Sequence, residues 1–385
     1  MTPPRGFPEA EFRDRTDRAQ ALMAKAGLSA LLLTTEPEVR YYTGFLTRFW
    51  ESPTRPWFVV IPASGAPIAV IPSIGAHLMG QTWLDDIRTW QAPDYDDDGI
   101  GLLAETLQEV TPPDARIGVA DQMESHLRMP LADFQTLKQS LGARRITGDA
   151  TITRRLRMVK SRAELAKITC AAQIADRAFD RVAEIARVGI PLARVFRDFQ
   201  RLCLEGGADW VPYLAGASEA GGYGDVISPA TEAPLAAGDV LMLDTGLVWD
   251  GYFCDFDRNF SLGAPSAAVT EGHGRLIEAT QAGFQAAKPG ARICELFHAM
   301  TDIVNPGGAG SDAGRLGHGV GMQLTEWPSI IAADKTVLAE GMVLTLEPGV
   351  TLPDGKIMVH EENIVIEAQG ARFLSSPQDR EIRVI

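Results

Sequence analysis

The sequence has few cysteines and none of the long apolar runs that mark a membrane protein. Its four cysteines stand far apart and include no CxxC pair, at Cys170, Cys203, Cys254 and Cys294. We therefore expect neither a disulfide framework nor a thiolate zinc site. No apolar stretch approaches the ~20 residues of a membrane span, and residues 1–15 hold no apolar segment typical of a secretory signal. These absences favour a cytoplasmic protein with no membrane partner.

Basic residues are outnumbered by acidic ones. Lys and Arg total 36 against 50 Asp and Glu, which gives a formal net charge of −14. This balance disfavours non-specific binding to nucleic acid or anionic membranes, since both need a basic surface. We therefore expect a small-molecule or short-peptide substrate and no nucleic acid partner.

A length of 385 residues exceeds one ordinary core and suggests two domains. The first, residues 1–155, shows an amphipathic helix pattern over 12–26. Its short apolar strand patterns are at 28–34, 57–61, 67–71 and 117–120. This alternation predicts an α/β domain in which helices flank a sheet.

The pattern changes near residue 155, and residues 156–385 predict an α+β domain. Ser161 and Glu164 fit a capping box that opens its first helix. The expected helices are 162–186, 192–205, 271–287 and 293–303, and the strands cluster around 240–262 and 342–367.

Two segments of the second domain repeat one another. Residues 238–246 read GDVLMLDTG and residues 341–349 read GMVLTLEPG, each after a helix–loop–helix stretch with Gly and Pro. The repeat predicts a duplicated unit whose active site lies where the two halves meet. Each half would deliver one carboxylate there from the end of an apolar strand, Asp244 or Glu347.

Each copy continues into a hairpin that carries a second carboxylate. Asp244 and Asp255 lie nearly symmetrically about an Asp-Gly turn, and Glu347 and Glu361 lie symmetrically about a Pro-Asp-Gly turn. Asp244 and Asp255 are therefore expected to lie opposite or nearly opposite each other on one face, and Glu347 and Glu361 to face each other.

Two facing pairs of buried carboxylates repel one another unless cations offset them. Carboxylate oxygens with one imidazole suit two divalent ions, such as Mn²⁺, Fe²⁺, Co²⁺ or Zn²⁺. The candidate imidazole is His318 in RLGHGVGMQLTEWPSI, where flanking glycines allow close approach. Taken singly, each residue is better explained as an ordinary turn or loop residue. The repetition of the pairs is what favours a metal site.

At these residues the chain resembles the pita-bread metallopeptidases, which include methionine aminopeptidase, aminopeptidase P and prolidase, with creatinase as a metal-free relative. The order Asp, Asp, His, Glu, Glu matches, as do DGYFCDFDR, GHGVG, LEPG and HEEN. LMAKAGLSALLLTTEPEVRYYTGF and LRMVKSRAEL resemble the N-terminal domain and interdomain entry of the creatinase/prolidase branch. The resemblance implies a pita-bread catalytic domain over 156–385, a smaller creatinase-like domain over 1–155, and a homodimer.

The resemblance also implies roles for the matching residues. Asp255 and Glu361, rather than the neighbouring Glu362, would bridge two divalent ions, and Glu347 would pass a proton to the leaving nitrogen. The resemblance thus implies a dinuclear metallohydrolase like Xaa-Pro dipeptidase or aminopeptidase P. The implied metal ligands are Asp244, Asp255, His318, Glu347 and Glu361.

Two positions depart from the family pattern. The peptidases carry a substrate histidine seven residues after the metal histidine, where this chain has Thr325. A second histidine lies about 17 residues before the first ligand aspartate, and residues 221–234 contain none here. We keep Thr325 as a substrate-binding candidate, although threonine cannot shuttle a proton near pH 7.

The departure leaves other functions open. A non-peptidase that acts on an osmolyte-like compound, by ectoine-type amide hydrolysis or dimethylsulfoniopropionate-type lyase cleavage, is favoured by the missing histidines without being established. An inactive binding protein is disfavoured, because all five ligands are retained.

Two further residues have alternative interpretations. Asp257 stands where the family has Thr or Ser, and is either an additional carboxylate beside the ligands or the partner of Arg258. Trp50, between Arg48 and Arg55, is either packed at a strand end or a substrate contact for the active site of a second subunit.

The variant Thr325→His tests the departure. We expect it to leave turnover of Xaa-Pro dipeptides unraised and to damage the native reaction, because a bulky, partly charged ring would fill space shaped for threonine. Steady-state kinetics on a panel of Xaa-Pro dipeptides measure this. A clear gain in peptide turnover would mean that the threonine is a degraded substrate histidine.

Overall fold

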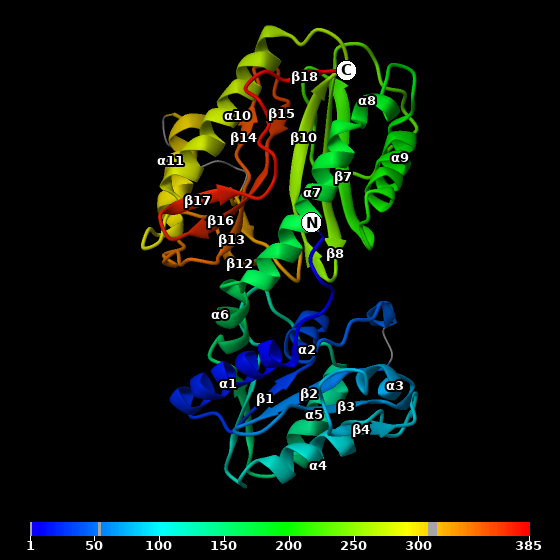
Figure 1. Cartoon of the computed structure of the whole chain (residues 1–385), viewed down its shortest axis with the longest axis vertical. Coiled ribbons are helices and arrows are strands. Elements are labelled where there is room, and N and C mark those ends of the chain that lie inside the picture. The colour runs from blue at the N-terminus through cyan, green and yellow to red at the C-terminus, as the bar shows by residue number, and fades with distance from the viewer. Residues whose placement is uncertain (1, 53–54, 307–313) are drawn as a thin grey trace. The chain divides into compact units, whose positions relative to one another are not determined.

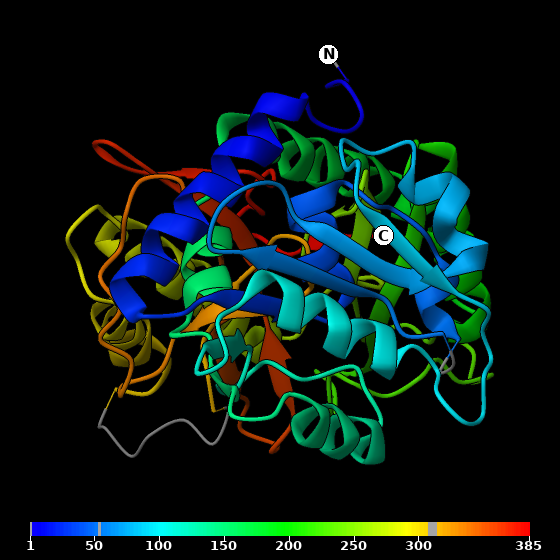
Figure 2. The same ribbon diagram turned by 90° about the horizontal axis from the view of Figure 1, so that it is seen from below.

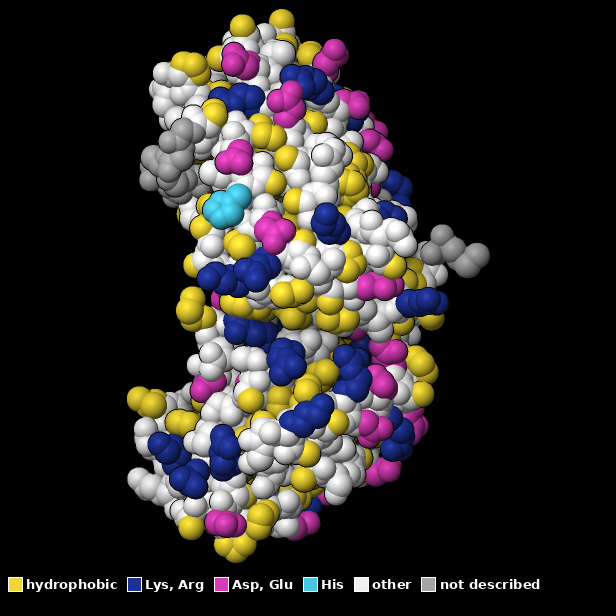
Figure 3. Space-filling view, turned by 90° about the vertical axis from the view of Figure 1, so that its left-hand side faces the viewer, with side chains coloured by type: hydrophobic (Ala, Val, Ile, Leu, Met, Phe, Trp, Pro, Cys, Tyr) yellow, Lys and Arg dark blue, Asp and Glu magenta, His cyan; other side chains and the backbone are white. Residues whose placement is uncertain are grey.

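The computed structural model describes residues 2–52, 55–306 and 314–385. The chain divides into two compact units, Pro4–Arg157 and Met158–Ile385, which are drawn in Figure 1. Among the described residues, no helix has both the length and the hydropathy of a membrane span. On the face drawn in Figure 3, side chains of both charge signs are interspersed with uncharged ones.

The N-terminal unit is built on one six-stranded sheet. The sheet order is β4-β3-β2-β1-β5-β6. The strands are β1 (Ala30–Leu33), β2 (Phe58–Pro62), β3 (Ile68–Pro72), β4 (Ile87–Trp90), β5 (Arg116–Val119) and β6 (Arg145–Gly148). The helices are α1 (Glu9–Ala26), α2 (Glu36–Thr43), η1 (Phe49–Glu51), η2 (Ser73–Gly75), α3 (Ala76–Met79), α4 (Ile100–Val110), α5 (Leu131–Ser140) and α6 (Ile152–Met158).

Helices cover both faces of this sheet. Figure 2 shows α1 on one face and α4 with α5 on the other. Alternate strand residues such as Leu32 and Val60 join Leu103 and Leu137 of those two helices in one buried cluster. The predicted sheet flanked by helices is therefore confirmed, and β4 and β6 extend it beyond the strands that the sequence indicated.

Trp50 makes its contacts within the N-terminal unit. Its ring centroid lies 6.0 Å from that of the buried Trp57. The Arg128 guanidinium lies 5.2 Å from the Trp50 ring centroid and donates a hydrogen bond of 3.2 Å to the Trp50 carbonyl. These contacts match the packed alternative, and a contact between Trp50 and substrate stays a prediction.

The C-terminal unit contains two five-stranded sheets, β18-β10-β8-β7 with β9 paired to β8, and β12-β11-β13-β16-β17. Its helices are α7 (Arg162–Asp180), α8 (Val182–Ile185), α9 (Leu192–Glu205), α10 (Ala267–Ala286) and α11 (Ile293–Val304). The first sheet contains β7 (Trp210–Ala220), β8 (Asp239–Trp249), β9 (Tyr252–Phe253), β10 (Phe256–Ser261) and β18 (Arg383–Val384). The second contains β11 (His318–Gly319), β12 (Glu326–Ser329), β13 (Val343–Leu346), β16 (Glu362–Glu367) and β17 (Gly370–Phe373), and β14 (Gly349–Thr351) pairs with β15 (Ile357–Val359).

The repeated sequence segments occupy equivalent places in the two sheets. The first forms β8, which pairs with β10, and the second forms β13, which pairs with β16. Figure 1 shows α7 and α9 beside the first sheet and α10 and α11 beside the second. The duplication and α+β class predicted from the sequence are thus visible in the fold.

The predicted start of α7 is also correct. The Glu164 amide donates to Ser161 Oγ at 3.3 Å, and the Ser161 amide donates to Glu164 Oε2 at 2.9 Å. This reciprocal capping box satisfies two backbone donors that a helix start leaves without partners. The predicted helix over 162–186 is divided, since α7 ends at Asp180 and α8 follows.

Candidate metal centre

The order of the second sheet brings three predicted ligands side by side. His318 opens β11, Glu347 follows β13, and Glu361 immediately precedes β16. Because β11 lies beside β13 and β13 beside β16, these side chains come from three adjacent strands. Asp255 comes from the first sheet, just before β10, and contacts β16 through Asn363.

The second hairpin has the register that its symmetric turn predicts. Leu346 pairs with Glu362 between β13 and β16, and Gly349 pairs with Val359 between β14 and β15. Both registers place Glu347 opposite Glu361. The predicted facing of this pair is confirmed.

The first hairpin is shifted relative to the prediction. Asp244 pairs directly with Asp257, and Thr245 pairs with Phe256. The tight turn is centred between Asp250 and Gly251, both with positive φ, one residue later than an Asp244–Asp255 pairing requires. Asp255 is therefore diagonal to Asp244 rather than opposite it.

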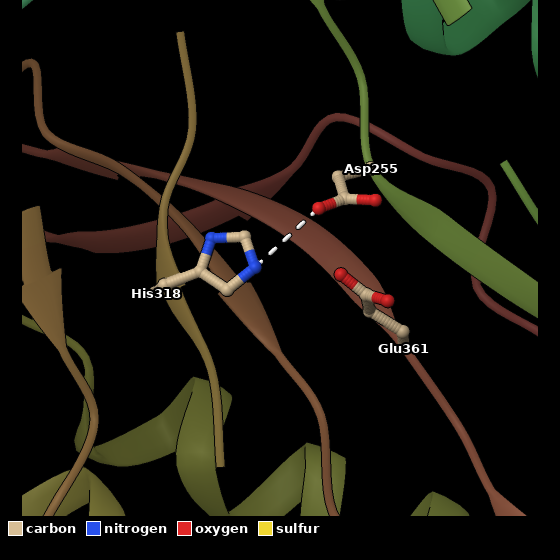
Figure 4. A group of neighbouring side chains, drawn as sticks. All are labelled: Asp255, His318 and Glu361. Atoms are coloured by element: carbon tan, nitrogen blue, oxygen red, sulfur yellow. Dashed lines mark ion pairs between the residues drawn. The ribbon is translucent and has the colours of Figure 1, made fainter. Parts of the chain in front are cut away.

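His318 aims one ring nitrogen at the carboxylates. Its Nε2 lies 3.0 Å from Glu347 Oε1 and 3.4 Å from Asp255 Oδ2, as Figure 4 shows for Asp255. Its Nδ1 lies 2.8 Å from the Gly319 carbonyl, which can only accept, so Nδ1 carries a proton. In the neutral ring the Nε2 lone pair then faces the carboxylates, as a metal ligand requires.

The buried core of this cluster has the spacing of a metal site. One ligand atom each from Asp255, His318 and Glu361 lies within 4.8 Å of the others, and all three side chains are buried. The flanking glycines are needed for close packing. A Cβ on Gly317 would lie 2.3 Å from the Thr345 carbonyl, and one on Gly319 would lie 2.4 Å from the Trp327 carbonyl.

The carboxylates perturb one another strongly. Burial, then the charge of Asp257, raises the pKa of Asp244 to about 8. Burial and neighbouring carboxylates also raise the pKa of Asp255 and of Glu361 well above the ordinary range. Burial is the largest influence on Glu347 and opposes its ionisation. The charge and hydrogen bond of His318, the Thr345 hydrogen bond and the charge of Arg315 together outweigh burial and lower the pKa of Glu347 to about 2.

Polar side chains that the sequence analysis missed hold the predicted ligands. The Asp255 amide donates to Asn363 Oδ1 at 2.9 Å, and Asn363 Nδ2 donates back to the Asp255 carbonyl. The His318 amide donates to Thr345 Oγ1 at 2.9 Å, and that hydroxyl donates to Glu347. Asn363 and Thr345 are wholly buried polar residues in apolar strands, a pattern that could have identified them.

Asp257 supports the centre from a network of its own. Its Oδ1 accepts the Glu361 amide at 2.9 Å and lies 3.4 Å from His360 Nδ1. Among the described residues, the ion pairs of Arg258 are with Glu362 at 3.0 Å and Asp176 at 3.8 Å. The Asp257 carboxylate is thus the additional one beside the ligands, and pairing with Arg258 is not its role.

Thr325 lies on an anchored turn between β11 and β12. Glu326 Oε1 accepts the amides of Met322 at 2.8 Å and Gln323 at 3.2 Å. Glu326 also pairs with the buried Lys160 at 3.1 Å. On this turn Thr325 Oγ1 accepts a hydrogen bond of 3.3 Å from Arg315 Nη2, a residue that the sequence analysis did not identify.

Comparison with known proteins identifies the family of this chain. Residues 166–368 match the family model of metallopeptidase family M24, and residues 15–159 match the model of the Creatinase/Prolidase N-terminal domain. The chain belongs to metallopeptidase family M24. It is therefore a metallohydrolase of the creatinase/prolidase branch, and the predicted pita-bread fold is confirmed.

Several dipeptidases are similar to this M24 chain over most of its length. A "Probable dipeptidase PepE" of Mycobacterium tuberculosis is 30% identical over 371 residues, which cover 94% of this chain and 93% of that protein. A "Xaa-Pro dipeptidase" of Pyrococcus horikoshii is 29% identical, covering 65% of this chain and 72% of that protein. The crystal structure of dipeptidase PepE from Mycobacterium ulcerans superposes with a TM-score of 0.84 at 27% identity, covering 98% and 99% of the two chains.

Membership of M24 implies divalent metal ions, and the residues present fit them. Asp244 Oδ1 and Glu361 Oε1 are buried and have no hydrogen-bond partner among the described residues. An unpartnered buried carboxylate oxygen is costly. Together with His318 Nε2, these oxygens form a set of hard O and N donors that divalent ions satisfy.

The raised pKa values predict how this M24 protein responds to pH without metal. Between about pH 4 and pH 8 the folded state binds more protons at Asp244 than the unfolded state does, so stability falls as pH rises. Glu347, whose pKa falls from 4.5 to about 2 on folding, makes stability rise with pH, but only below about pH 5. Thermal unfolding of chelator-treated protein from about pH 5 to pH 8 measures it.

Asp244→Asn is the matched control, because it removes the titrating group and keeps the side-chain shape. Its unfolding temperature should depend less steeply on pH than that of the wild type, and added Mn²⁺ should stabilise the wild type most at the higher pH. A metal-free wild type that gains stability from pH 5 to pH 8 would contradict the assignment.

Proposed function

We propose that this M24 enzyme is a dinuclear hydrolase that cleaves the amide bond of a dipeptide, as an Xaa-Pro dipeptidase does. The observation that carries the proposal is the approach of His318 Nε2 to carboxylates from both halves of the duplication, Asp255 and Glu347. In the same cluster, one buried oxygen each of Asp244 and Glu361 has no hydrogen-bond partner among the described residues. The dipeptidase names of its relatives support a peptide substrate.

Two ions would share the carboxylates of the centre. Asp244 would bind one ion and His318 and Glu347 the other, while Asp255 and Glu361 would bridge them. Asp255 and Glu361 suit the bridging role because both are buried and lie within reach of His318. Their raised pKa values mean that a charged pair needs nearby positive charge.

Bound divalent ions supply an acidified water and polarise the carbonyl of the scissile amide. The chain's own contribution is proton transfer and orientation. Glu347, held by Thr345 and His318, would accept the proton of the attacking water and give it to the leaving nitrogen. Tyr213 donates a hydrogen bond of 3.0 Å to Asp244 Oδ2, which fixes that carboxylate and leaves Oδ1 for an ion.

A second candidate is hydrolysis or cleavage of a small osmolyte-like compound at the same centre. Thr325 favours it, because a neutral hydroxyl stands where the related peptidases have an imidazole.

Assembly as a homodimer and a cytoplasmic location also stay predictions. Sedimentation velocity tests the homodimer.

Metal content tests the bridging assignment. Purified protein should contain about two divalent ions per chain. Asp255→Ala and Glu361→Ala should each lower the metal content and abolish turnover, because each removes a shared ligand. Elemental analysis measures the ions, and Glu367→Ala, an exposed glutamate of the same strand β16, is the control. Full metal loading of both ligand variants would refute the bridging roles.

Substrate profiling tests the reaction. Metal-loaded protein should hydrolyse Xaa-Pro dipeptides, with activity lost on chelation and restored by Mn²⁺ or Co²⁺. Parallel assays with other dipeptides and with small non-peptide amides separate the two candidates. Turnover confined to the non-peptide amides would overturn the dipeptidase proposal in favour of the second candidate.

A further inference from the structure

One cation beside the metal centre has no part in the mechanism above. Arg315 precedes His318 by three residues and is half-buried. Its one hydrogen bond among the described residues goes to the uncharged Thr325 Oγ1, at 3.3 Å. Among those residues no carboxylate forms an ion pair with it, although several carboxylates lie nearby.

Arg315 is close enough for its charge to reach the ligands. Burial and the other carboxylates raise the pKa of Asp255, and the charge of Arg315 opposes that rise. The charge of Arg315 adds to that of His318 in lowering the pKa of Glu347. The guanidinium therefore lies in the field of the centre without being paired to any one ligand.

The contact with Thr325 gives the guanidinium a fixed orientation. Thr325 lies on the turn that Glu326 pins through two backbone amides and the buried Lys160. A guanidinium has five donors in one plane, and Thr325 occupies only one of the two terminal nitrogens. A planar donor face is left, which matches a carboxylate in two-pronged geometry.

Charge balance indicates what that donor face binds. Once divalent ions neutralise the ligand carboxylates, no carboxylate of the described residues forms an ion pair that offsets the charge of Arg315, and a half-buried cation without a counter-charge is unfavourable. We propose that Arg315, oriented by Thr325, binds a carboxylate of the substrate. This inference rests on the proposed dipeptidase function and narrows the substrate to compounds with a carboxylate near the scissile amide, such as the free C-terminus of a dipeptide.

The test compares a dipeptide with the same dipeptide as its C-terminal amide, which lacks the negative charge. Wild-type, metal-loaded enzyme should prefer the free acid by roughly 30-fold in kcat/KM, as hydrogen bonds to a charged group typically contribute. Arg315→Gln should abolish the preference, chiefly by raising KM for the acid, and Arg315→Lys should retain part of it. Equal preference in wild type and Arg315→Gln would overturn the proposal.

Thr325 is a positioning residue for Arg315, and two variants test the role of its hydroxyl. Thr325→Val removes the hydroxyl at nearly constant volume and should weaken the preference for the acid severalfold, whereas Thr325→Ser should keep it. Metal content, from elemental analysis, should be unchanged in all four variants. A loss of metal in Arg315→Gln would show that the arginine supports the ligands, and this result would overturn a substrate role.

Binding of proline and of prolinamide to metal-loaded protein separates this proposal from the proposed function. Calorimetry should show proline binding more tightly to wild type than prolinamide does, with the difference lost in Arg315→Gln. Dipeptide hydrolysis without this discrimination would overturn the carboxylate site and leave the dipeptidase function standing. Discrimination without dipeptide hydrolysis would support the carboxylate site and overturn the dipeptidase function.

Discussion

The candidate metal centre of this protein depends on holding several carboxylates close together in a buried site. Asp244, Asp255 and Glu361 all have pKa values raised by burial and by neighbouring carboxylates. Such a cluster costs free energy in the folded chain unless positive charge is supplied. The packed strands, the close-fitting glycines and the buried hydrogen bonds of Asn363 and Thr345 resist that repulsion and hold the ligands ready.

The duplication explains how one chain assembles such a cluster. Each copy ends a buried apolar strand with a carboxylate and returns with a second one, so the two sheets contribute acidic side chains to a common interface. The second copy also adds β11, and with it His318, beside β13. The halves are therefore similar in backbone and different in chemistry: the first contributes carboxylates, and the second contributes carboxylates and the imidazole.

Much of this arrangement could be predicted from the sequence, because it depends on local pattern and on symmetry about turns. The capping box at Ser161 and the facing of Glu347 and Glu361 follow from short-range spacing. Asp244 and Asp255 lie on one face as expected, but diagonally. The turn is centred one residue later than a direct pairing requires, which moves each strand partner by two residues and makes Asp257 the direct partner of Asp244. Arg315 was missed because its partner lies ten residues away on a turn that Lys160 and Glu326 hold, and no periodicity reveals such a contact.

The pairing of Arg315 with Thr325 bears on what the missing histidine means. An imidazole at position 325 would offer a charge that depends on pH, whereas Arg315 is charged at every physiological pH. Threonine does not replace that charge. Instead, Thr325 orients the permanent charge of Arg315, which precedes His318 in the sequence whereas Thr325 follows it. A chain without this imidazole can therefore still recognise an anion. For this reason Thr325 argues less strongly against a peptidase once its contact with Arg315 is known than it does in the sequence alone.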